Sequence, residues 1–137
     1  MQQFTLDISK KNRIEVWEGE MKIIAVDGKP TFFYYEERLV PLLTILQHNP
    51  LLKKITVDQG AIKFIVNGAD IMRPGIVDIE EGIQKNEAIM IIDAVHKKVL
   101  AVGIALFDSK EMQNLSSGKM IKNIHYVGDD VWKMVVN

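Results

Sequence analysis

Two nearly continuous apolar segments, residues 87–93 and 99–107, constrain the fold of this 137-residue chain more than any other feature. Strands with one solvated face alternate apolar and polar side chains, whereas strands that are buried on both faces do not. The short link between the segments predicts that they pair as an antiparallel hairpin. Gly103 lies inside the second segment and predicts a bulge or a tight bend there.

The first 52 residues predict a small antiparallel sheet with one covering helix. Alternating or β-branched sequence predicts three strands, at residues 13–18, 21–26 and 31–35. Asp27-Gly28 suits the tight turn between the second and third strands. Residues 40–48 then show helical spacing, with Pro41 in the first turn, and this helix would stabilise the three short strands.

A helix followed by a glycine-rich return is predicted next. Asp58 is placed to cap the helix, and Gly68 is placed to end it. The return runs from Gly68 to Gly75. Its glycines allow the close approach of a ligand, and Arg73, the only arginine in residues 53–137, can make a bidentate phosphate contact. A turn that needs positive φ angles explains the same residues, so both interpretations stay open.

The C-terminal part predicts one more helix and two more strands. A short helix is expected from Ser109 to Leu115, without a full capping box, and a strand from Lys119 to Tyr126. After a turn at Gly128, residues 131–135 are expected to form the closing strand. The chain therefore predicts an α+β fold with two domains, a small N-terminal α/β domain and a mostly-β domain, at residues 1–52 and 53–137.

Composition excludes several classes of function. The chain has no cysteine, so disulfides, zinc–thiolate sites and thiol nucleophiles are impossible. The net charge is −1, so nonspecific binding to a long polyanion has no electrostatic basis, and any nucleic-acid contact must use a local patch. The longest apolar segments are about half the ~20 residues that a membrane helix needs. We expect a soluble cytoplasmic protein.

No group of residues predicts an active site or a metal site. The three histidines lack the spacing of metal ligands. Residues 116–119 look like the end of a phosphate loop, but Gln113 stands where that loop needs glycine, and no Ser or Thr follows Lys119. Asp129 and Asp130 can be imagined as paired carboxylates, yet beside a glycine they are interpreted as turn residues. We therefore expect neither catalysis nor a cofactor.

Four segments of the second domain resemble the PUA domain, named for pseudouridine synthase and archaeosine transglycosylase. They occur in the expected order, at residues 57–64, 68–76, 101–105 and 118–132. The preceding segment, Pro41 to Pro50, narrows the resemblance to the malignant-T-cell-amplified-sequence family of translation machinery-associated proteins and its archaeal relatives. The chain departs from the eukaryotic members at two points: it begins later, and Arg73 stands where they usually have cysteine.

The resemblance implies a six-stranded pseudobarrel with short helices that binds RNA. The implied contact surface consists of the first PUA helix, the glycine-rich return and the last strand. By position, the implied RNA-contacting residues are Lys63, Gly68, Ala69, Asp70, Ile71, Met72, Arg73, Pro74, Gly75 and Lys133. The implied partners are structured ribosomal or transfer RNA, the small ribosomal subunit and a protein with an initiation-factor-like domain. Neither DNA nor a membrane is expected.

The sequence supports three hypotheses of function. The first is a non-catalytic RNA-binding protein that contacts the small ribosomal subunit or the 3′ end of a transfer RNA in translation initiation or recycling. The second is a subunit that presents RNA to a separate tRNA- or rRNA-modification enzyme. The third is a protein-interaction scaffold whose PUA fold no longer binds RNA.

Overall fold

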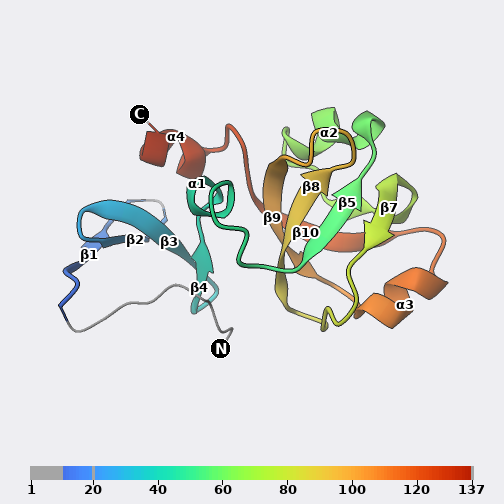
Figure 1. Cartoon of the computed structure of the whole chain (residues 1–137), viewed down its shortest axis with the longest axis horizontal. Coiled ribbons are helices and arrows are strands. Elements are labelled where there is room, and N and C mark those ends of the chain that lie inside the picture. The colour runs from blue at the N-terminus through green and yellow to red at the C-terminus, as the bar shows by residue number, and fades with distance from the viewer. Residues whose placement is uncertain (1–10, 20, 137) are drawn as a thin grey trace.

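The computed structural model describes residues 11–19 and 21–136 of the chain. Its strands form two sheets that stand side by side (Figure 1). In chain order, the elements are β1 (Ile14–Trp17), β2 (Ile23–Val26), β3 (Lys29–Tyr35), β4 (Arg38–Pro41), α1 (Leu43–Leu46), β5 (Lys54–Val57), α2 (Gln59–Ile65), β6 (Ile71–Met72), the 3-10 turn η1 (Arg73–Gly75), β7 (Ile76–Ile79), β8 (Ala88–Asp93), β9 (Val99–Ala105), α3 (Ser109–Asn114), β10 (Lys119–Tyr126) and α4 (Asp130–Val136).

The four-stranded sheet is antiparallel, with the order β1-β2-β3-β4. Asp27 and Gly28 have φ angles of 52° and 80° and form the expected turn between β2 and β3. The prediction of three strands followed directly by a helix is wrong at its end. Residues 38–41 form a fourth strand, and α1 spans only four residues. Pro41 ends an edge strand, where a residue without an N–H group is tolerated.

The six-stranded sheet has the order β6-β10-β9-β8-β5-β7. β5 and β8 pair in parallel, and the other neighbours are antiparallel. The edge strands β6 and β7 follow each other in the chain through η1, where the Asp58 N–H donates to the Gly75 carbonyl oxygen at 3.0 Å. This join gives the sheet a barrel-like shape. The α+β class and the pseudobarrel agree with expectation, while the domain boundary after residue 52 stays a prediction.

The hairpin of β8 and β9 is buried on both faces, as its continuous apolar sequence predicts. One face, with Ile89 and Ile91, belongs to the core inside the six-stranded sheet. The other face, with Met90 and Val102, packs against side chains of the four-stranded sheet and α1. Figure 1 shows β9 next to α1, in agreement with their contacts. Apolar packing on this shared hairpin therefore holds the two sheets together.

Gly103 marks a close approach between β9 and β10. A Cβ atom there would lie 2.3 Å from Ile121 Cγ2 and 2.8 Å from the Lys122 carbonyl oxygen. The register of the two strands shifts between Asn123, which faces Gly103, and His125. The irregularity that this glycine predicts is thus confirmed, and it lies in the facing strand.

Two C-terminal predictions are wrong. Helix α3 has a full capping box, in which Asp108 accepts the Glu111 N–H at 2.8 Å and Glu111 accepts the Asp108 N–H at 3.3 Å. The expected closing strand at residues 131–135 is instead part of helix α4. Asp129 accepts the Trp132 N–H at 2.8 Å, so a side-chain cap favours the helix, whose apolar side chains pack between the sheets.

Candidate functional site

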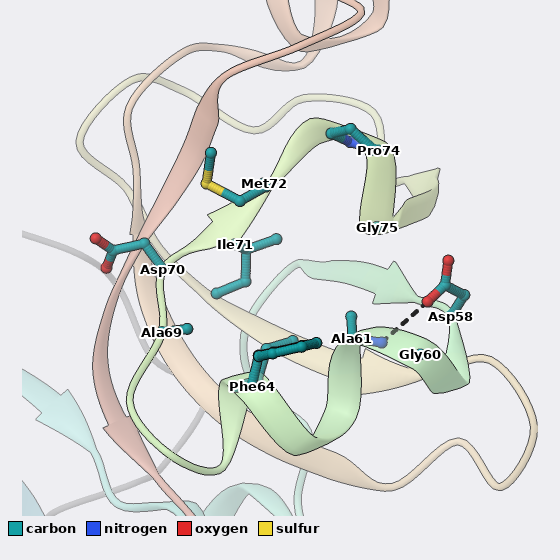
Figure 2. A pocket seen from close by; sticks show the side chains of 11 residues that line it. Asp58, Gly60, Ala61, Phe64, Ala69, Asp70, Ile71, Met72, Pro74 and Gly75 are labelled. Carbon is teal, nitrogen blue, oxygen red and sulfur yellow. Dashed lines mark hydrogen bonds between the residues drawn. The ribbon is translucent and has the colours of Figure 1, made fainter.

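A hollow of about 430 Å³ lies where α2, β6 and η1 meet, and we call it the α2–β6 groove. Figure 2 shows α2 on one side of it, with β6 and η1 on the other. The groove brings together the predicted contact residues from Ala69 to Gly75, except Arg73. The lining residues are Asp58, Gly60, Ala61, Phe64, Ile65, Ala69, Asp70, Ile71, Met72, Pro74 and Gly75.

Local sequence sets the walls of the groove. Asp58 Oδ1 accepts the Ala61 N–H at 3.1 Å and starts α2 (Figure 2). Gly68, with a φ angle of 94°, follows the end of the helix and turns the chain toward β6. A Cβ atom on Gly75 would lie 3.3 Å from Ala61 Cβ, so this glycine lets η1 pack closely on α2. The glycines of the return therefore shape the groove.

Apolar side chains form most of the groove. Ile65 and Ile71 are buried and form its floor, whereas Phe64 and Met72 are 57% and 48% exposed. Phe64 stands on the α2 side and Met72 on the β6 side (Figure 2). Large apolar side chains gathered at one exposed hollow indicate a surface that a partner covers. Flat groups with an apolar face, such as nucleotide bases, fit walls of this kind.

Asp70 lies at the β6 side of the groove and is held by β10. Lys119 Nζ lies 2.8 Å from its carboxylate, and the Asn123 N–H donates to it at 2.9 Å. Burial alone would raise the pKa of Asp70, but the hydrogen bonds from Lys119 and Asn123 outweigh burial and lower it. The Asn123 side chain also donates to the carbonyl oxygens of Ile65 and Ala69, both at 3.0 Å. β10 therefore anchors both the end of α2 and the start of β6.

Lysines flank the groove. Lys63, one of the predicted contact residues, lines a second hollow that shares Phe64 with the groove, and its Nζ lies 5.2 Å from the Phe64 ring centroid. Lys119 pairs with Met72 across β10 and β6, and about half of its side chain is exposed. Phosphates next to a base in the groove can therefore reach a cation on either side.

Arg73 does not line the groove. Its Nε donates to the Met112 carbonyl oxygen at 2.9 Å, and its Nη1 donates to the Ile76 carbonyl oxygen at 3.3 Å. Met112 lies in the last turn of α3, where carbonyl groups are open to partners outside the helix. Arg73 thus fastens η1 to α3, and the phosphate contact expected of it stays a prediction.

Lys133 lies apart from the other predicted contact residues. It was expected on the closing strand, but it belongs to α4, whose residues Val131 and Trp132 pack between the sheets. The last strand of the fold is β10. That strand brings Lys119 to the groove.

Sequence reasoning missed Phe64 and Lys119. The expected contact residues include the neighbouring Lys63 but not Phe64, and Lys119 was considered only as part of the false phosphate loop. One signal was available for Phe64. Five of the six residues at positions 61–66 are apolar, which is more than one face of a short helix can bury. For Lys119 there was no such signal, because its position depends on pairing with a strand 47 residues earlier in the chain.

Comparisons with known proteins agree on one family. The PUA-domain family matches residues 53–127. An uncharacterized protein of Methanocaldococcus jannaschii is 44% identical over 91% of this chain and 78% of its own length. Translation machinery-associated protein 20 of Saccharomyces cerevisiae is 33% identical over 94% of this chain and 76% of its own length. The chain belongs to the PUA-domain proteins of the translation machinery-associated family.

A solved structure shares the arrangement of this PUA-domain protein. It is the crystal structure of a hypothetical protein from the hyperthermophilic archaeon Pyrococcus horikoshii, with a TM-score of 0.84 and 33% identity over 94% of this chain and 83% of that chain. Among the described residues of the PUA-domain protein, no group of three or more acidic, histidine or cysteine side chains is arranged to hold a metal ion. No helix in the described part has both the length and the apolar character to cross a bilayer.

Proposed function

We propose that this PUA-domain protein is a non-catalytic RNA-binding protein of the translation machinery that takes an unpaired nucleotide into the α2–β6 groove. The supporting observation is an apolar groove in which exposed Phe64 and Met72 stand between two lysines, Lys63 and Lys119. Unpaired bases stack on aromatic side chains, while cations contact the phosphates on either side. Bases inside a duplex are not free to enter such a groove, so loops and chain ends are the expected targets.

The relatives named translation machinery-associated protein 20 support the link to translation. On this basis we infer that the RNA belongs to the small ribosomal subunit or is the 3′ end of a transfer RNA. The protein then acts in the cytoplasm, in initiation or recycling, together with a partner that has an initiation-factor-like domain. Both RNAs offer unpaired nucleotides, which are the parts of RNA that proteins read most readily.

The proposed RNA contacts are Lys63 and the return from Gly68 to Gly75, with Phe64 and Lys119 added on the evidence of the groove. Arg73 stays in the set, but replacing it also removes the hydrogen bonds that hold η1. Lys133 has the least support, because it lies on α4. Phe64 therefore offers the clearest test of the site.

Replacing Phe64 with alanine is expected to weaken RNA binding about five- to 150-fold, because stacking on an aromatic side chain contributes about 1–3 kcal/mol per base. The measurement is the Kd for deacylated transfer RNA and for a twelve-nucleotide oligouridylate at one fixed salt concentration. Val95→Ala is the matched control, since Val95 is equally exposed, at 58%, but does not line the groove. Equal affinities of the Phe64→Ala variant and the unmodified protein would refute the groove as the binding site.

Sedimentation of the tagged protein through a gradient of cell lysate tests the link to translation. Comigration with the small ribosomal subunit at low salt, lost as salt rises, is expected from phosphate contacts. Copurification with a modification enzyme in place of ribosomes would favour the RNA-presenting hypothesis. Absence of any RNA from the protein purified at low salt would favour the scaffold hypothesis.

A further inference from the structure

β10 carries a second exposed lysine beyond the groove. Lys122 follows Lys119 by three residues, which is about 10 Å along a strand. Met120 and Ile121 between them are both buried, because the pairing with β6 is irregular there, and both lysines reach solvent. Burial raises the pKa of Asp70, whereas the hydrogen bond from Lys119 and the charge of Lys122 lower it, so both cations lie near the same carboxylate.

Lys122 also reaches the four-stranded sheet. Its Nζ lies 5.6 Å from the ring centroid of Tyr35, the last residue of β3. The Tyr35 side chain is also the main cause that raises the pKa of Lys122. Arg38 faces Tyr35 across β3 and β4, and its Nη1 donates to the carbonyl oxygen of Asn86, just before β8. The β3–β4 hairpin is therefore fastened to the six-stranded sheet at Asn86, and Tyr35 lies next to Lys122 of β10.

The charge of Lys122 is available to a ligand. Lys119 pairs with Asp70 while about half of its side chain stays exposed, whereas among the described residues no carboxylate lies within 4.0 Å of Lys122 Nζ. Glu36, at the tip of the β3–β4 hairpin, is the other acid whose charge acts on Lys122, and it is exposed to solvent. A solvated carboxylate at longer range is screened by salt and competes weakly with a phosphate in direct contact.

We propose that RNA leaving the α2–β6 groove follows β10 and places a backbone phosphate on Lys122, beside Tyr35 of the four-stranded sheet. The proposal rests on the proposed function, because the groove supplies the first nucleotide site. Phosphate contacts set orientation and affinity without reading sequence. Lys122 is thus a second RNA contact, used only by chains long enough to leave the groove. Tyr35 is a positioning residue, through which the four-stranded sheet takes part in RNA binding.

The test compares two single-stranded probes, a uridine trinucleotide and a twelve-nucleotide oligouridylate. Lys122→Ala is expected to weaken binding of the long probe about five- to tenfold and to change binding of the short probe less than twofold. Since one phosphate contact in single strands contributes about 0.7 to the slope of log K against log salt, the slope for the long probe should fall by about that amount. Lys110→Ala, an exposed lysine on α3, is the control.

A second variant tests the positioning role. Tyr35→Phe keeps the ring over which Lys122 lies but removes the hydroxyl, so affinity for the long probe should fall about two- to threefold with the salt slope unchanged. Unchanged affinity of Lys122→Ala for the long probe would overturn the proposal. If Phe64→Ala weakens both probes in the same experiment, the groove stands and only the path along β10 is refuted. If Phe64→Ala weakens neither, the proposed function itself fails.

Discussion

Replacing Gly103 with alanine is expected to destabilise the protein by about 3 kcal/mol, at the upper end of the usual cost of overpacking a core. The added Cβ would lie 2.3 Å from Ile121 Cγ2 and 2.8 Å from the Lys122 carbonyl oxygen. Ile121 is fully buried, and the carbonyl belongs to the backbone of a paired strand. The Lys122 oxygen cannot move without separating β9 from β10, so a rotation of the Ile121 side chain alone does not relieve the clash.

Urea denaturation followed by circular dichroism measures the effect as a shift in midpoint. Gly128→Ala is the control, because a Cβ there meets nothing within 4 Å and the cost is limited to the positive φ angle of 92°. That cost is about 1–2 kcal/mol. A Gly103→Ala variant as stable as the Gly128→Ala variant would contradict the close approach between the strands. RNA binding by the folded fraction is a second measurement, since β10 carries both Lys119 and Lys122.

The buried hairpin was predictable because its signal is unambiguous. A strand with charged residues on one face can be solvated there, but residues 88–92 and 99–105 have no charged residue on either face. Two layers must therefore cover them, and the four-stranded sheet supplies the second layer. Few other arrangements of this chain would bury both faces of the hairpin.

Two elements, β4 and α4, were not predicted from the sequence. The local sequence pattern of each is ambiguous. Residues 131–135 contain apolar side chains at positions that suit a strand and a helix equally well. The helix is decided by Asp129, whose carboxylate accepts the N–H groups of Tyr126 and Trp132. Asp129 had been interpreted correctly as a turn residue. Its role as a helix cap depends on the backbone N–H groups that lie near it in the folded chain.

The sequence singled out the segment that lines the groove, but not the contacts that its side chains make. The glycine-rich return lines the groove, and Gly75 lets η1 pack closely on α2. Arg73 was the natural choice for a phosphate contact, because exposure and hydrogen-bond partners cannot be read from residue type. Phe64 shows the converse, since an exposed aromatic in a helix has the same sequence pattern as a buried one.

Replacing Asp129 with alanine is expected to destabilise the protein by about 3 kcal/mol, because it leaves several buried donors without an acceptor. The carboxylate lies 2.9 Å from His125 Nδ1 and accepts the N–H groups of Tyr126 and Trp132. His125 is 1% exposed, and its Nε2 accepts the Leu43 N–H at 3.2 Å. The proton of the neutral ring must therefore lie on Nδ1 and point at Asp129. One carboxylate thus links β10, α4 and, through His125, the start of α1.

The pH dependence of the stability of Asp129→Asn distinguishes the effect of the ionised carboxylate from the effect of side-chain shape. Burial raises the pKa of Asp129, but the hydrogen bonds from His125, Trp132 and Tyr126 outweigh it and lower the pKa in the folded protein. The stabilisation is therefore complete above the unfolded-state pKa of about 3.9 and is lost as pH falls through the lower folded value. The unmodified protein should be more stable than Asp129→Asn by a constant amount above about pH 5, with the gap closing in more acidic solution. Asp130→Asn, at an exposed neighbour, is the control. A gap between Asp129→Asn and the unmodified protein that persists undiminished in strong acid would show that the ionised carboxylate is not what joins the two sheets at His125.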